Sequence, residues 1–144
     1  MGLLTSLLYD NNINAVLNDE RSTNLGTVYE SVVAQELHAH GYTLHYYDNK
    51  KKGEVDFLID DFDNLMALPL EVKSGKDYKI HSALNNFLST PLYNIHRAVV
   101  LSNEREVYNE NGITYMPIYY SMFFNHDTID SDNLIIPVLE PPML

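Results

Sequence analysis

Cysteine is absent from the 144-residue sequence. This absence excludes disulfide bonds, thiolate nucleophiles and zinc or iron–sulfur sites built on cysteine. It also fits a reducing compartment, and we expect the chain to be cytoplasmic. The length suits a single domain that can bury a hydrophobic core, and 45% hydrophobic residues is ordinary for a globular protein.

Positive charge and long apolar runs are also scarce. Nine lysine and arginine residues stand against 20 aspartate and glutamate residues, which gives a formal net charge of −11. Proteins that bind duplex nucleic acid normally carry a basic face, so this balance argues against a free-standing DNA-binding protein. No apolar run approaches the roughly 20 residues that cross a bilayer. The sequence therefore predicts no transmembrane helix, and we expect no membrane partner.

The sequence predicts one domain with a separate N-terminal entry. Residues 1–24 read as a short apolar helix followed by an Asn- and Asp-rich loop, and we expect them to be the tail of an upstream domain. Residues 25–144 form the domain itself, with no internal repeat and no low-complexity linker. The chain contains no glycine-rich phosphate loop, so an ATPase module would have to lie elsewhere in a parent protein.

Helix and strand signals alternate along this domain. A helix is predicted over residues 25–40, with Asn24 as its N-cap and Gly41 just after its end. Pro69 indicates an edge position or a bulge for the strand that contains it. The order of signals predicts an α/β layered domain with a mixed sheet. After the first helix come three strands in a meander, a helix and two strands, at residues 42–47, 54–60, 65–73, 79–88, 97–102 and 114–124.

The sharpest functional signal is Glu71-Val72-Lys73, at the end of a predicted strand and before a glycine turn. Side chains alternate along a strand, so Glu71 and Lys73 share one face. The carboxylate and the Val72 carbonyl oxygen are ligands that suit Mg²⁺, while the lysine would lie near an attacked phosphate. The alternative is an exposed ion pair without function, because this three-residue pattern is common.

Two further carboxylates strengthen the signal. Asp56 lies in a strand where Val55 and Phe57 are expected to share the opposite face, and antiparallel pairing could bring it beside Glu71. Glu30 interrupts the apolar stripe of the first helix, where a buried acid needs a partner or a metal ion. Either acid could instead be solvated, Asp56 on a polar strand face and Glu30 at the edge of the helix.

The helix segment GTVYESVVAQEL and the strand segments GEVDF and EVKSG together resemble a known group of proteins. They contain Glu30, Asp56, and Glu71 with Lys73. The set resembles the PD-(D/E)XK nuclease superfamily. It is most similar to one branch, the C-terminal nuclease-like domains of unknown function that are attached to prokaryotic AAA-type ATPases.

The resemblance covers about residues 25–90 and implies a restriction-endonuclease-like three-layer core, in which helices flank a mixed sheet. Val55 stands where the superfamily has a proline before the first aspartate. The resemblance also implies a Mg²⁺ or Mn²⁺ ion bound, directly or through water, by the carboxylates of Glu30, Asp56 and Glu71, with Lys73 as the catalytic lysine. Together with the Val72 backbone carbonyl argued above, these residues make up the predicted metal site.

Other candidates for function are weaker. The basic turn of Lys50, Lys51 and Lys52 precedes the Asp56 strand and is a candidate phosphate contact, although such runs are more often solvated turns. His81 is a candidate to line the site. A group of C-terminal aromatic residues could stack with bases, but core or partner contacts are the more common use of such residues. These are Tyr115, Tyr119, Tyr120, Phe123 and Phe124.

The residues and the resemblance together predict a Mg²⁺-dependent nuclease or nuclease-derived domain that acts on DNA, and the resemblance implies that it is the C-terminal part of an AAA-type ATPase. The alternative is a non-catalytic module that keeps the fold as a protein-docking or regulatory platform for its ATPase. The acidic net charge favours the alternative, whereas the intact set of three carboxylates and a lysine favours the nuclease. Binding of nucleic acid by the isolated domain is expected to be weak.

Overall fold

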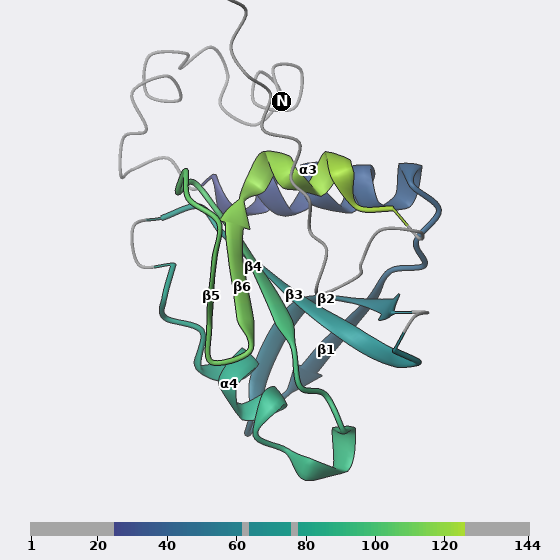
Figure 1. Cartoon of the computed structure of the whole chain (residues 1–144), viewed down its shortest axis with the longest axis vertical. Helices are drawn as coiled ribbons and strands as arrows, with labels where there is room; N and C mark the ends of the chain where they lie inside the picture. Colours follow the sequence, from purple (N-terminus) through teal and green to yellow (C-terminus); the bar gives the residue numbers. More distant parts are fainter. Residues whose placement is uncertain (1–24, 62–63, 76–77, 126–144) are drawn as a thin grey trace, which may run out of the picture.

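The computed structural model describes residues 25–61, 64–75 and 78–125 of the chain. These residues form a layered α/β arrangement of helices on a six-stranded sheet (Figure 1). The predicted lead-in of residues 1–24, with the predicted N-cap Asn24, lies outside the described residues. Within the described ranges, no helix is long and apolar enough to cross a membrane.

Helix α3 (Gly26–Ala39) agrees with the predicted first helix to within one residue at each end. The helix stops at Gly41, whose φ of 84° is readily adopted only by glycine. The amides of Gly41 and Tyr42 donate to the carbonyls of His38 and Leu37, both at 3.0 Å. These bonds satisfy carbonyl groups that the end of the helix would otherwise leave unpaired.

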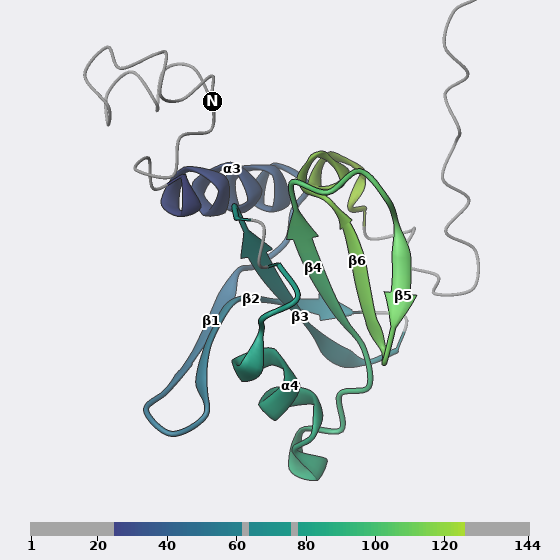
Figure 2. The same ribbon diagram turned by 90° about the vertical axis from the view of Figure 1, so that its left-hand side faces the viewer.

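The six strands form one mixed sheet in the order β1-β2-β3-β4-β6-β5. Strands β1, β2 and β3 form the predicted antiparallel meander. Strands β3, β4 and β6 run parallel, and β5 pairs antiparallel with β6 (Figures 1 and 2). The prediction of an α/β domain with a mixed sheet is confirmed. The strand bounds are β1 His45–Asn49, β2 Gly53–Asp61, β3 Met66–Lys73, β4 Ala98–Ser102, β5 Tyr108–Glu110 and β6 Ile113–Pro117.

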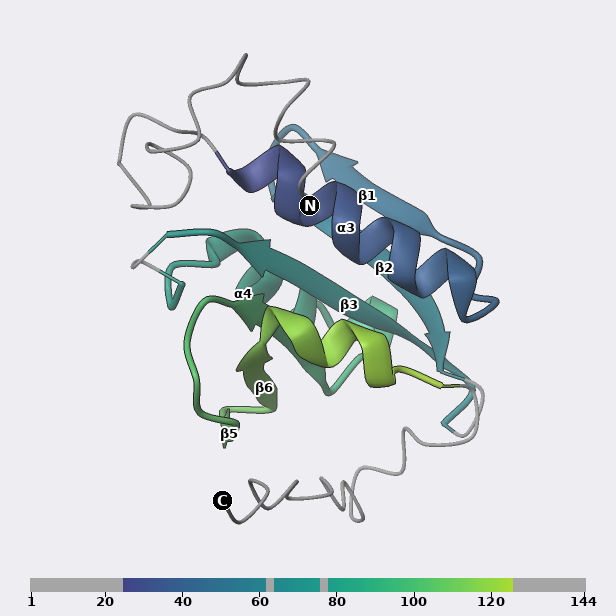
Figure 3. The ribbon, with the colours of Figure 1, turned by 90° about the horizontal axis from the view of Figure 1, so that it is seen from above.

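Helices cover both faces of this sheet. Helix α3 and the 3₁₀ helix η2 (Ile118–Phe123) lie side by side on one face (Figures 1 and 3). Helix α4 (Ser82–Leu88) packs on the other face, and the short 3₁₀ helix η1 (Pro91–Tyr93) follows it. The arrangement is consistent with the three-layer core that the resemblance implies.

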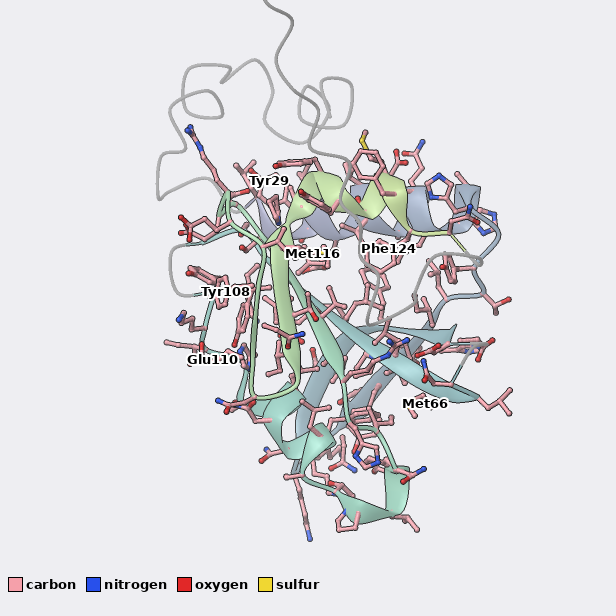
Figure 4. All side chains as sticks on the ribbon, viewed as in Figure 1. Tyr29, Met66, Tyr108, Glu110, Met116 and Phe124 are labelled. Atoms are coloured by element: carbon pink, nitrogen blue, oxygen red, sulfur yellow. The ribbon has the colours of Figure 1, made fainter. Side chains whose placement is uncertain are left out.

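The hydrophobic core accordingly has two parts, one on each side of the sheet. The α3-side cluster includes Tyr29, Met116 and Phe124, which lie at the end of the sheet that α3 and η2 cover (Figure 4). The α4-side cluster includes Leu84 and Phe87 of α4. The sheet therefore separates two apolar layers, and a strand residue can be assigned to a face by the cluster in which it packs.

Strand β2 contains a bulge beside β1. Between the pairs that His45 and Tyr47 make with β2, one β1 residue lies opposite two β2 residues, Asp56 and Phe57. Val55 consequently packs in the α4-side cluster, whereas Phe57 packs against the α3-side cluster. The prediction that Val55 and Phe57 share a face is wrong, because the bulge adds a residue to the two-residue period of the strand.

Several element boundaries also differ from the prediction. Strand β1 begins at His45 rather than at residue 42, because Tyr42 caps α3 and is buried in the α3-side cluster. Helix α4 begins three residues later than predicted, because His81 has an extended φ of −140°. The last predicted strand ends at Pro117 and continues as η2, since proline has no N–H to extend the ladder. Strand β5 was not predicted.

Pro69 lies in β3, the third strand of the sheet, and not at the predicted edge or bulge. The Val72 amide points toward β2, so the Pro69 nitrogen, three residues earlier, points toward β4. The β3–β4 ladder begins at the pair of Leu70 with Val99. Pro69 thus precedes that ladder and removes no hydrogen bond from it, which is why a central strand tolerates it here.

A buried carboxylate holds the turn between β2 and β3. Asp61 is 2% exposed, accepts hydrogen bonds from the main-chain and side-chain amides of Asn64, and forms an ion pair with Arg97. A buried charge is tolerated when it is paired and hydrogen-bonded. These contacts fix one end of the β2–β3 pair, and the candidate site lies toward its other end.

Gly53 offers a test of how closely α4 packs on β2. Its φ is +95°, and an added Cβ would lie 2.7 Å from the Ala83 Cβ of α4. Gly53→Ala should therefore lower the free energy of unfolding by about 2–3 kcal/mol, because it combines backbone strain with steric overlap. Urea denaturation followed by circular dichroism measures this loss.

The control is Gly75→Ala, because no atom lies within 4 Å of its added Cβ. This variant should change the free energy of unfolding by less than about 0.5 kcal/mol. Equal losses for Gly53→Ala and Gly75→Ala would contradict the close packing of α4 on the start of β2.

Candidate functional site

The residues Glu71, Val72 and Lys73 form the end of β3, as predicted. Val72 packs in the α3-side cluster, so Glu71 and Lys73 alternate to the α4 side of the sheet. The Lys73 ammonium donates to Glu71 Oε1 at 2.6 Å. Glu71 is 6% exposed, whereas about 29% of the Lys73 side chain is exposed. In this ion pair the glutamate is therefore buried, and the lysine is the partner that contacts solvent.

Asp56 lies across from this strand end and bonds to it directly. Its Oδ2 accepts a hydrogen bond from the Val72 amide at 2.7 Å. The last paired residues of β2 and β3 are Phe57 and Leu70, so the regular ladder has already stopped at this point. The carboxylate of Asp56 takes the place of a main-chain acceptor. The two strands consequently diverge here, and the bulge in β2 provides the extra residue.

The Val72 carbonyl faces the same gap between the strands. The N–H and C=O groups of one strand residue point to the same side of the strand. Because the Val72 amide points toward β2, its carbonyl does so as well. A carbonyl oxygen and the carboxylates of Asp56 and Glu71 therefore border one gap, which is the arrangement of oxygen atoms that a hard cation prefers.

Glu30 approaches this gap from α3 and is half-buried. Burial raises the pKa of Glu30, the negative charge of Asp56 raises it further, and the positive charge of Lys73 lowers it. Glu30 therefore lies within electrostatic range of both residues. In the structure the four predicted residues Glu30, Asp56, Glu71 and Lys73 therefore lie close enough for their charges to interact.

Burial dominates the acidity of the other two carboxyl groups. Burial raises the pKa of Asp56, and the bond from Val72 and the charge of Lys73 oppose it. Burial also raises the pKa of Glu71. The hydrogen bond from Lys73 opposes this shift, while the charges of Asp56 and Glu30 add to it. One lysine thus does not fully compensate for the carboxylates gathered around the gap.

The oxygen atoms fit a cation bound by two carboxylates better than one bound by three. Among the described residues, no three His, Asp or Glu side chains gather closely enough to hold one metal ion. Glu71 Oε2, however, is buried and has no hydrogen-bond partner within the described ranges. Such an atom is costly to bury unless something pairs with it. Mg²⁺ commonly takes one or two carboxylates and completes its shell with water, which this set allows.

Only two of the three lysines in the basic turn remain candidate phosphate contacts. Lys50 and Lys51 are exposed at the tip of the β1–β2 hairpin. Lys52 donates to Thr90 Oγ1 at 3.2 Å and lies 5.1 Å from the centre of the Tyr93 ring. It therefore fastens the hairpin to the segment around η1, which leaves Lys50 and Lys51 as the candidate phosphate contacts.

His81 forms a pair that the sequence did not suggest. Its Nε2 lies 2.6 Å from the Tyr115 hydroxyl, and both residues are buried. Tyr115 pairs with Val100, which pairs with Glu71, so the three share a row across the sheet. His81 and Tyr115 thus lie on the face of Glu71 but two strands away. No sequence signal could have found a histidine and a tyrosine 34 residues apart.

The C-terminal aromatic group divides between core and surface. Tyr115 and Phe124 are buried in the two core clusters, and Tyr120 packs against the α3-side cluster. Tyr119 and Phe123 are exposed on η2. None of the five borders the gap between β2 and β3 through a described contact.

The raised pKa values predict how stability depends on pH in the absence of metal. Asp56 and Glu71 bind protons more tightly in the folded than in the unfolded state, whose ordinary values are 3.8 and 4.5. The free energy of unfolding should therefore fall as pH rises from about 4 through the raised values. Asp56→Asn/Glu71→Gln lacks these charges, so its melting temperature should exceed that of the wild type at pH 7–8 and approach it near pH 4.

The control for this measurement is Glu54→Gln/Asp60→Asn, which removes two charges from exposed positions on the same strand. Thermal melts across pH 4–8 compare the three proteins. If the control variant gains as much stability at pH 8 as the site variant, relief of the overall negative charge is the cause and the site is not.

A model of the family described as Domain of unknown function (DUF4143) matches residues 25–120, a stretch that runs from α3 into η2. No curated protein matches the chain. The matched stretch contains Glu30, Asp56, Glu71 and Lys73, and it covers well over half of the sequence. The chain belongs to the DUF4143 family of domains, whose function is unknown.

Proposed function

We propose that this chain is a metal-dependent nuclease-like domain that hydrolyses phosphodiester bonds in DNA as the C-terminal part of an AAA-type ATPase. One observation carries the proposal. Asp56 bonds to the end of β3 that bears Glu71 and Lys73, and a buried oxygen of Glu71 there has no hydrogen-bond partner in the described part of the chain. Such a site suits a small hard cation and an anionic substrate.

Each residue has a role that follows from its position. Asp56, Glu71 and the Val72 carbonyl would bind Mg²⁺ or Mn²⁺ directly, and Glu30 would act through a water molecule, since it does not complete a three-residue group. A metal ion held there supplies positive charge at the phosphate and lowers the pKa of a bound water. The chain itself holds these oxygens in place through the bond between Asp56 and the Val72 amide.

Lys73 is the residue proposed to act on the substrate. Its ammonium group is partly exposed while it contacts Glu71, so a phosphate oxygen in the gap could reach it. The positive charge would orient the phosphate and offset the negative charge that develops as the bond breaks. Because Lys73 makes a single contact in a large complex, it should matter more to the rate than to binding.

The net charge of −11 favours a second candidate function, a docking or regulatory platform that keeps the fold without catalysis. An acidic domain is repelled from DNA unless a basic partner holds the two together. The two candidates differ in one requirement, because only the nuclease needs a metal ion in the gap between β2 and β3. Metal binding is therefore the first test.

Mg²⁺ or Mn²⁺ should stabilise the wild-type chain through this site. A metal ion at ten times its dissociation constant, bound only to the folded state, adds about 1.4 kcal/mol to the free energy of unfolding. That gain corresponds to a rise of about 5 °C in melting temperature. Asp56→Asn/Glu71→Gln should lose the rise, and Glu54→Gln/Asp60→Asn should keep it. Equal rises in all three proteins would mean that the ion binds elsewhere on the acidic surface.

Cleavage should require both a local supply of DNA and Lys73. The isolated chain should cut weakly at physiological salt and better at low salt, because contacts with phosphate are electrostatic. Fusion to a basic DNA-binding domain should raise cleavage by raising the effective concentration of DNA. In that fusion, Lys73→Met should reduce the cleavage rate about 100-fold or more while DNA affinity changes little.

Lys50→Met/Lys51→Met is the matched comparison, since it removes two exposed lysines at the hairpin tip. It should weaken DNA binding and leave the rate at saturating DNA nearly unchanged. Gel-based cleavage and fluorescence anisotropy measure the two quantities. A fusion that cuts equally well with Lys73→Met would contradict the nuclease and leave the docking platform as the better account.

A further inference from the structure

The tip of the β1–β2 hairpin carries two exposed lysines, Lys50 and Lys51. Neither forms an ion pair with a described residue, whereas Lys73, Lys79 and Arg97 each pair with a carboxylate. Figure 2 shows the hairpin extending from the sheet beside α4, which is in contact with β2. In a chain with a net charge of −11, this tip therefore offers exposed positive charge that no described carboxylate neutralises.

Polar contacts attach the base of the tip to α4 and to the segment that follows it. The Lys52 ammonium donates to Thr90 Oγ1 at 3.2 Å, and the same hydroxyl donates to the Asn86 carbonyl at 2.7 Å. The Asn86 side-chain amide donates to the Lys52 carbonyl at 3.3 Å. Within the turn, Asn49 Oδ1 accepts hydrogen bonds from the main-chain amides of Lys51 and Lys52. The main chain of the tip is therefore held both within the turn and against α4.

An aromatic group attaches the hairpin a second time. The ring centre of Tyr93 lies 4.7 Å from that of Phe87 and 6.0 Å from that of Tyr47. The hydroxyl oxygens of Tyr47 and Tyr93 are 3.1 Å apart, and the Lys52 ammonium lies 5.1 Å from the centre of the Tyr93 ring. Edge-on ring contacts and a cation over a ring are both stabilising. Tyr93 therefore contacts β1, α4 and the basic turn at the same time.

The hairpin tip lies a short distance along β2 from the candidate site. Gly53 begins β2 directly after the tip, and Asp56 follows it by three residues. A strand rises about 3.3 Å per residue, so the two positions are about 10 Å apart. One strand of duplex DNA advances about 3.4 Å per nucleotide along its axis, so this separation corresponds to about three nucleotides.

We propose that Thr90 and Tyr93 are positioning residues that hold the hairpin tip against the DNA backbone, about three nucleotides from the phosphate at the gap between β2 and β3. The inference rests on the proposed function, because it takes DNA to be the ligand. Exposed loop tips are usually mobile, and ordering them on binding costs affinity. A tip that is already held loses less freedom when DNA binds. These two residues should consequently affect DNA affinity and not the step that breaks the bond.

A spin label measures whether the tip is held. The chain contains no cysteine, so Lys51→Cys provides a single labelling position at the tip. Electron paramagnetic resonance should show a more mobile label when Tyr93→Leu is added. Thr90→Val/Tyr93→Phe removes two hydroxyls and keeps the ring, so it should also raise mobility, and it serves if Tyr93→Leu does not fold. Leu92→Ala is the control, because Leu92 is 87% exposed in the same 3₁₀ helix and should leave the label unchanged.

A double-mutant cycle measures whether the positioning serves DNA. At low salt, Lys50→Met/Lys51→Met should weaken the binding of duplex DNA to the isolated chain, as followed by fluorescence anisotropy. Tyr93→Leu should weaken binding about threefold when the two lysines are present, and it should have no further effect when they are absent. In the fusion to a basic DNA-binding domain, Tyr93→Leu should leave the cleavage rate at saturating DNA unchanged.

The outcomes separate this inference from the proposed function. An unchanged label mobility in Tyr93→Leu, or an equal loss of affinity with and without the two lysines, would overturn the positioning role. An affinity that Lys50→Met/Lys51→Met does not change would remove the phosphate contact from the proposed function, and the positioning role with it. Affinity is measured without metal and without cleavage, so a failure of the metal site or of Lys73 would leave the result of the cycle unchanged.

Discussion

The hydrogen bond from the Val72 amide to the Asp56 carboxylate is the interaction on which the shape of the candidate site depends. In a regular antiparallel ladder this amide would meet a main-chain carbonyl of β2. The bulge in β2 withdraws that carbonyl, and a side chain replaces it, so the strands separate without leaving the amide unpaired. One additional residue in β2 therefore opens the gap and also brings a carboxylate to its edge. Glu71 and Lys73 contribute chemistry only because this gap exists beside them.

Sequence predicted the parts of the fold that local interactions determine. Gly41 marked the end of α3, and the apolar run of β4 was found because buried strands read as continuous hydrophobic segments. The features of the fold that the sequence did not predict depend on contacts between residues that are distant in the sequence. His81 is held by Tyr115, which shortens α4, and Pro69 is tolerated because of where the β3–β4 ladder begins. Neither constraint leaves a periodic signal in the sequence.

The sequence was enough to predict which residues form the candidate site, but it did not predict how they are arranged. The spacing of Glu71 and Lys73 and the acid in the preceding strand indicated which residues to consider. The sequence did not predict that Glu71 Oε2 would be buried without a described partner, or that no three acidic side chains of the described residues would gather closely enough to hold one metal ion. Both features depend on how far the strands diverge and how deeply they are covered. The bulge that controls this divergence also reversed the expected face of Val55.

The same bulge also affects one edge of the sheet. Among the described strands, β1 and β5 are the outer ones, and each has main-chain groups that another chain could pair with. Strand β5 has only three residues. Strand β1 lies against the bulge, which increases the local twist and makes a straight neighbouring strand a poor fit. The irregularity that aims Asp56 at Val72 therefore also protects the domain against edge-to-edge aggregation, so its loss would endanger solubility as well as the site.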